Sequence, residues 1–132
     1  MHRRLLLAAP ILAGLVACTP SPAPTADAPR VVVFFTADSA ALDESAQQVI
    51  RQAAEMARAS PAAPVRVLGF AAPDTGTPAF NRALAQARAQ NVADGLVAAG
   101  VARDRVRIQP RGAVPFELLP TESRRVEIAI SA

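Results

Sequence analysis

The chain has 132 residues, of which 52% are hydrophobic and 19% charged, and its formal net charge is +3. The single histidine, His2, and the single cysteine, Cys18, lie near the N-terminus, so the rest of the chain has no imidazole base, no thiolate, and no nitrogen or sulfur ligand for a metal. All fourteen basic residues are arginine, and two of them precede residue 18. The remaining twelve arginines against eleven acids leave no electrostatic footprint for nucleic acid.

Residues 1–17 have the layout of a secretory signal. Arg3 and Arg4 precede an apolar run over residues 5–16 that ends in small side chains. The run is too short to span a bilayer as a helix, and Pro10 interrupts it. We therefore expect this segment to be a cleaved signal peptide.

Cys18 stands at the predicted cleavage point. The stretch Leu15-Val16-Ala17-Cys18 resembles the lipobox of bacterial lipoproteins. The resemblance implies that the thiol is acylated, with chains such as palmitate, and that more than one chain anchors the protein durably. By resemblance to the sorting rule of enterobacterial lipoproteins, Thr19 favours the outer membrane. The alternative is an ordinary secreted protein whose leader happens to end near a free thiol.

Residues 19–30 are rich in Pro, Ala, Ser and Thr, a composition that cannot build a core. Extended as polyproline II, this segment would reach about 37 Å, at roughly 3.1 Å per residue. We predict three parts: a signal peptide over 1–17, the lipidated cysteine and a tether over 18–30, and one folded domain over 31–132 that can stand off the membrane.

The folded part begins with a strand, a helix and a second strand. Residues 31–35 form a continuous β-branched and aromatic run, typical of a strand covered on both faces. From Asp43 the apolar residues recur at helical spacing until Ser60-Pro61 ends the helix. Residues 64–70 then alternate as a second strand.

A second helix has the sharpest local signals in the chain. Thr77 is placed to cap it, Pro78 occupies the first helical position, and Gly100 supplies the left-handed residue after its end near residue 99. Strands over 106–108 and 126–130 follow. The order β-α-β-α-β-β predicts a two-layer α/β sandwich, with two helices packed on a mixed four-stranded sheet.

One edge of the second helix carries candidate binding residues. Asn81 and Arg88 are seven positions apart and so lie within about 20° of each other around the helix. Leu84 falls beside them, whereas we expect Phe80 and Val92 to be core. The planar guanidinium of Arg88 matches a carboxylate in a bidentate geometry, so this edge favours an anionic small group. A solvated Arg88, or one paired with Asp94 or Glu122, is the alternative.

These residues resemble a known family. The motifs are Gly69-Phe70, Asp74 and Gly76, then Phe80-Asn81-x-x-Leu84-x-x-x-Arg88-Ala89-x-x-Val92, and Arg124-Arg125-Val126-Glu127. Together they are similar to the OmpA-like peptidoglycan-binding domain, also found in peptidoglycan-associated lipoproteins, over about residues 31–132.

The resemblance implies noncovalent binding of the peptidoglycan stem peptide, in which an Asp and an Arg hold diaminopimelate. The carried-over site residues are Asp74, Asn81, Leu84 and Arg88. On this interpretation the protein is not an enzyme, has no cofactor or metal, and tethers the outer membrane to the cell wall from the periplasm. An Arg88→Ala change would then abolish binding and leave thermal unfolding nearly unchanged.

The sequence departs from the family pattern at the acidic position. The loop after Gly69 carries one extra residue, so Pro73 takes the usual place of the Asp and Asp74 is displaced by one. Asp74 can swing into place or serve only to form the turn. If the ligand site has decayed, the domain would instead be a protein-docking module in an envelope assembly. A two-carboxylate glycan hydrolase ranks last, because Asp74 has no evident partner.

Overall fold

The computed structural model describes residues 29–74, 76–115 and 119–131. In chain order the elements are β1 (Arg30–Phe34), α1 (Glu44–Ala59), β2 (Val65–Ala71), α2 (Pro78–Ala98), β3 (Val106–Ala113) and β4 (Arg125–Ile130). The 3-10 helices η1 (Arg103–Arg105) and η2 (Pro120–Ser123) precede β3 and β4. The predicted order β-α-β-α-β-β is confirmed. The expected signal peptide, Cys18 and all but the last two residues of the tether lie outside the described residues.

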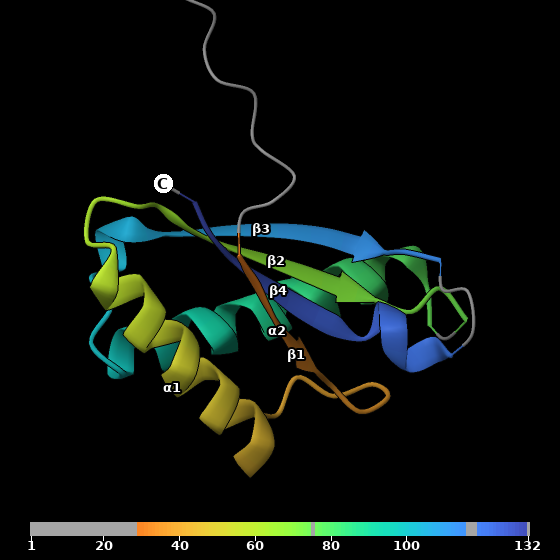
Figure 1. Ribbon diagram of the computed structural model, residues 1–132. Helices are drawn as coiled ribbons and strands as arrows, with labels where there is room; N and C mark the ends of the chain where they lie inside the picture. The colour runs from red at the N-terminus through yellow and green to blue at the C-terminus, as the bar shows by residue number, and fades with distance from the viewer. Residues whose placement is uncertain (1–28, 75, 116–118, 132) are drawn as a thin grey trace, which may run out of the picture.

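The four strands form one mixed sheet in the order β1-β4-β2-β3. Strand β4 runs antiparallel to both β1 and β2, whereas β2 and β3 are parallel. Figure 1 shows α1 and α2 on the same face of this sheet. Helix α2 packs chiefly against β2 and β3, and α1 packs against β1 and against α2. The architecture is the predicted two-layer sandwich.

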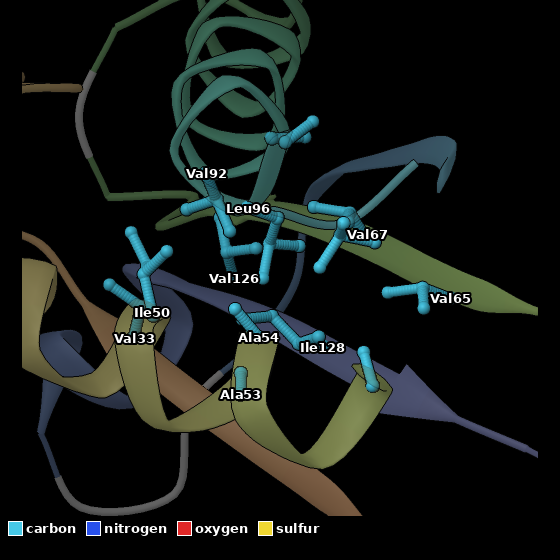
Figure 2. Packing of buried hydrophobic residues seen from close by; sticks show 14 of the residues in the cluster. Val33, Ile50, Ala53, Ala54, Val65, Val67, Val92, Leu96, Val126 and Ile128 are labelled. Carbon is cyan, nitrogen blue, oxygen red and sulfur yellow. The ribbon is translucent and has the colours of Figure 1, made fainter. Parts of the chain in front are cut away.

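The core fills the space between the helices and the sheet. Figure 2 shows Val33, Val65, Val67, Val126 and Ile128 of the sheet meeting Ile50, Ala53 and Ala54 of α1 and Val92 and Leu96 of α2, all of them buried. Small alanines on both helices let the two layers approach closely. Neither α1 nor α2 combines the length and apolarity needed to cross a bilayer.

The ends of α2 follow the predicted signals. The Thr77 hydroxyl accepts a hydrogen bond from the backbone N–H of Phe80 at 3.1 Å, and Pro78 occupies the first turn. At the other end Gly100 has a φ of +102° and Val101 N–H donates to the Leu96 carbonyl at 3.0 Å. This left-handed ending returns the chain toward β3.

Three expectations need correction. Both helices pack on one face of the sheet, so the other face of β1 is open and Phe34 is 53% exposed, contrary to the prediction of cover on both faces. Phe80 is 43% exposed and is not core, although Val92 is fully buried as predicted. Strand β3 extends to Ala113 through Pro110, because an edge position leaves the missing proline N–H without consequence for the ladder.

Candidate ligand-binding site at the carboxyl end of β2

The site is built where α2 crosses β2 at very close range. A Cβ atom added to Gly69 would lie 2.1 Å from the Ala85 carbonyl oxygen, so only glycine fits at this point of the strand. Ala85 itself is fully buried. The close crossing sets Asn81 and Arg88, on either side of Ala85, against the carboxyl end of β2.

Arg88 is fully buried, and its guanidinium is held by three backbone carbonyls. Its Nε donates to Ser39 at 2.8 Å, one terminal nitrogen donates to Phe70 at 3.0 Å, and the other donates to Thr36 at 3.0 Å. Its Cζ also lies 5.2 Å from the centroid of the Phe35 ring. The expectation that Arg88→Ala would barely affect unfolding is therefore wrong, because that change would strand three carbonyl acceptors in the interior.

The charge of Arg88 survives this burial. Desolvation by burial and, to a smaller extent, the positive charge of Arg124 lower the pKa of Arg88 to about 10, and the negative charge of Asp38 opposes both effects. A pKa near 10 keeps the guanidinium protonated at neutral pH. The carboxyl end of β2 therefore contains a buried cation, an electrostatic setting that favours anionic groups close to it.

Asp74 does reach this end of the sheet, but its ion-pair partner is Arg124. Asp74 Oδ2 lies 3.6 Å from Arg124 Nη2, and the two side chains are 38% and 17% exposed. The positive charge of Arg124 also acts on Arg88, so the ion pair has an electrostatic link to the buried guanidinium. Asp74 and Arg124 are partly exposed, whereas Arg88 is fully buried.

The structure places Asn81 and Arg88 on the same buried face of α2, as the spacing predicted. Asn81 is 3% exposed, and its side-chain oxygen has no hydrogen-bond partner among the described residues. A buried carbonyl oxygen without a donor is costly, so it favours a ligand or water that supplies one. Leu84 is half-buried at the border of the same face.

The two acids considered as alternative partners of Arg88 make other interactions. Asp94 lies 3.3 Å from Arg103 at the far end of α2. The Glu122 carboxylate accepts from the Leu119 backbone N–H at 3.2 Å and so caps η2. Arg88 instead stays with the residues at the carboxyl end of β2.

Two parts of the site were missed by sequence reasoning. The loop between β1 and α1 supplies two of the carbonyls on Arg88, and within it Asp38 adopts a left-handed backbone with a φ of +53°. The signal was the change from an apolar run to Ala37-Asp38-Ser39. Arg124 is the second: it stood in the motif Arg124-Arg125-Val126-Glu127 but was not among the predicted site residues. It diverges from Arg125, which lies 4.3 Å from the centroid of the Phe70 ring, as the alternation of a strand requires.

The family follows from a direct match of the sequence. A family model described as the OmpA family matches residues 34–123, which include α1, α2 and every residue of the candidate site except Arg124. The chain belongs to the OmpA family. Within the described residues of this OmpA-family domain, no group of three or more His, Cys, Asp or Glu side chains could hold a metal ion.

Two relatives of this OmpA-family chain are outer-membrane proteins by name. Outer membrane protein 40 of Porphyromonas gingivalis is 37% identical over 102 residues, which cover 74% of this chain and 27% of that protein. Outer membrane protein A of Yersinia pseudotuberculosis is 36% identical over 141 residues, covering 89% of this chain and 39% of that protein. The chain thus spans well under half the length of these relatives.

Solved structures confirm the OmpA-like fold. The peptidoglycan-associated lipoprotein from Burkholderia pseudomallei superposes with a TM-score of 0.70 at 24% identity, covering 76% of this chain and 89% of that one. The C-terminal domain of Helicobacter pylori MotB gives a TM-score of 0.64 at 26% identity, covering 75% and 81%.

Proposed function

We propose that this OmpA-family chain binds peptidoglycan noncovalently through its stem peptide and, anchored by acyl chains on Cys18, tethers the outer membrane to the cell wall. The observation that carries the proposal is the ion pair of Asp74 with Arg124, whose charge acts on the buried cation of Arg88. The free end of diaminopimelate carries an ammonium and a carboxylate. A site with both signs of charge at its surface and a fixed positive charge beneath it suits such a zwitterion.

The accessible residues make the first contacts. Asp74 accepts the ligand ammonium, and Arg124 binds the ligand carboxylate, so the ligand replaces their ion pair with two new ones. Arg88 is fully buried, and three of the five N–H donors of a guanidinium are engaged by carbonyls. Two donors remain for the ligand carboxylate once the Asp74–Arg124 pair has opened. Asn81 supplies an acceptor for an N–H group, and Leu84 forms the apolar border.

The position of the site in the domain suits a tether. Strand β1 begins at Arg30, next to the end of β4, whereas Asp74 lies just beyond the carboxyl end of β2, at the opposite end of the sheet (Figure 1). Strands of this length separate the two ends by about 20 Å. A chain that enters from a membrane anchor at one end therefore presents the candidate ligand site at the other.

Retention on purified sacculi tests the proposal. The mature chain with Cys18→Ser is incubated with sacculi, alongside Asp74→Asn and Arg124→Gln variants. A matched control is the exposed pair of Asp94 and Arg103 at the far end of α2, changed to Asn and Gln in the same way. We expect the site variants to lose retention at moderate salt and the control pair to keep it. Free diaminopimelate should compete with the sacculi.

A second function is favoured by one specific observation. Arg88 has no exposed surface, and the Asp74 carboxylate is already engaged by Arg124. If this closed arrangement persists, the domain is a docking module for an envelope protein. That function predicts a stable domain without sacculus retention, and a protein partner that co-purifies with the full-length lipoprotein. Sacculus retention that Asp74→Asn abolishes contradicts it.

The membrane anchor is tested separately. Intact-mass measurement of the chain extracted from membranes should show cleavage before Cys18 and the added mass of acyl chains, and Cys18→Ser should release the chain to the soluble fraction. A mature chain with an unmodified thiol would contradict the lipoprotein interpretation and leave the wall-binding proposal intact.

A further inference from the structure

Three arginines form one row across the open face of the sheet. Arg30 of β1 pairs in register with Ala129 of β4, Ala129 pairs with Arg66 of β2, and Arg66 pairs with Arg107 of β3. Paired residues of neighbouring strands point to the same face of a sheet. The buried Val65 lies one residue before Arg66, so the row points away from α1 and α2.

The charge of this face is not balanced by neighbouring acids. Arg125 and Glu127 lie on the same face, and Glu127 pairs with Arg30 at 3.2 Å and with Arg125 at 3.0 Å. Four arginines and one glutamate give the face a net charge of +3. Arg66 and Arg107 make no ion pair with any described residue, and the Nε of Arg66 is shielded from water without a hydrogen-bond partner. Residues 19–132 as a whole have twelve arginines against eleven acids, so their charges nearly balance. The positive charge is therefore concentrated on this face of the sheet.

Apolar side chains accompany the arginines. Phe34 is 53% exposed, and Val32 and Leu68 are half-buried between the arginine row and Arg125. Among the residues that the structure describes, no helix covers this face. Figure 1 shows α1 and α2 on the opposite face of the sheet. A broad face that combines guanidinium groups with apolar side chains fits a headgroup layer, in which phosphates lie above acyl chains.

The row lies at the end of the sheet where the chain enters the domain. Arg30 is the first residue of β1 and the last residue of the predicted tether over residues 18–30. We propose that this arginine face docks on the anionic phospholipid surface to which the tether leads. Guanidinium groups bind phosphate through paired N–H donors, and attachment at Cys18 raises the local concentration of that surface. The inference rests on the lipid anchor of the proposed function for its setting, but the face itself can be tested without acylation.

Vesicle co-sedimentation of the mature chain with Cys18→Ser tests the docking. The vesicles are phosphatidylcholine alone, or phosphatidylcholine mixed with phosphatidylglycerol. We expect binding to the anionic vesicles at about 0.01 M ionic strength and much weaker binding at about 0.15 M, where the Debye length falls from about 30 Å to about 8 Å. Vesicles of phosphatidylcholine alone should bind little.

A double variant with a matched control locates the contact. Arg66→Gln with Arg107→Gln removes two arginines that hold no ion pair, and each should lower the affinity about five-fold, so that the double variant binds about 25-fold more weakly. The control, Arg51→Gln with Arg58→Gln, removes the same charge from exposed positions on α1. It should change the affinity by about two-fold or less. Circular dichroism verifies that both variants are folded.

Three results would overturn the docking. The first is no binding to anionic vesicles, and the second is an equal loss in both double variants, which would mean diffuse charge attraction. The third is self-association without vesicle binding that the Arg66 and Arg107 changes remove, which would assign the face to a second copy of the chain. The double variant should keep its sacculus retention, so failure of membrane docking and failure of wall binding are distinguishable.

Discussion

The carboxylate of Asp74 lies 3.6 Å from the guanidinium of Arg124, although the two residues are fifty positions apart in the chain. The pair joins the loop before α2 to the segment before β4, and the charge of Arg124 acts on the buried Arg88. An acid displaced by one position from the family pattern thus still lies at the candidate site. Its ion-pair partner is Arg124 and not the buried Arg88, whose guanidinium is held by backbone carbonyls.

Removing either charge of the Asp74–Arg124 pair should weaken sacculus binding far more than it lowers the stability of the fold. An exposed ion pair contributes about 0.2 to 1 kcal/mol to folding. Asp74→Asn and Arg124→Gln should therefore lower the free energy of unfolding by no more than about 1 kcal/mol each, while sacculus retention falls to background. Urea unfolding and pull-down of the same preparations measure both quantities. Full retention in both variants would remove the pair from the ligand site.

Arg88 should behave in the opposite way. Replacing it with Ala strands the carbonyls of Thr36, Ser39 and Phe70 in the interior, so we expect the free energy of unfolding to fall by about 3 to 5 kcal/mol. For a domain of about 100 residues this lowers the melting temperature by roughly 12 to 40 °C. Arg88→Lys keeps the charge but not the fork, and should also destabilise, because one ammonium cannot reach three carbonyls in different directions.

Calorimetry of the Arg88 variants, with the Arg103→Gln variant as a surface control, checks this expectation. A melting temperature within a few degrees of the parent for Arg88→Ala would mean that water replaces the guanidinium at little cost. The role of Arg88 would then be in binding alone.

The fold was predictable because local and global signals agree. Thr77-Pro78 and Gly100 mark the ends of α2 by chemistry that acts within a few residues, and the apolar periodicity of α1 identifies its buried face. The shared face of Asn81 and Arg88 follows from helix geometry alone. These features need no knowledge of the rest of the chain.

The ion pair of Asp74 and the carbonyl contacts of Arg88 could not be predicted in the same way. They depend on where the loop over 36–42 and the segment before β4 lie after folding, and no periodicity encodes that position. The exposure of Phe34 also required knowing that both helices pack on one face of the sheet, because an apolar run reads the same whether one or both faces of a strand are covered.

Stability and binding should be independent of pH between about 6 and 9. The chain after residue 18 has no histidine and no cysteine, and the pKa of Arg88, lowered by burial to about 10, keeps its guanidinium charged throughout that range.

Only above pH 10 does the titration of Arg88 affect stability. Since the pKa of Arg88 is lower in the folded chain than in the unfolded chain, the unfolded chain binds more protons there, so the contribution of Arg88 to stability rises with pH. Melting temperatures and sacculus retention at pH 6, 7, 8 and 9 check the plateau. A transition near pH 7 would require a titrating group outside this account.

The crossing of β2 and α2 predicts a sharp contrast between two glycines. A Cβ at Gly69 would lie 2.1 Å from the Ala85 carbonyl oxygen, and a backbone atom cannot give way without moving α2 from the sheet. Gly69→Ala should therefore cost more than about 3 kcal/mol or prevent folding, and it should displace Asn81 and Arg88 from the site. At Gly95 the nearest atom to an added Cβ is the Ile50 side chain at 3.2 Å, which can shift. Alanine there also gains about 1 kcal/mol of helix propensity, so Gly95→Ala should remain within about 1 kcal/mol of the parent. Urea unfolding of both variants tests the contrast, and equal destabilisation would show that α2 does not depend on the close approach at Gly69.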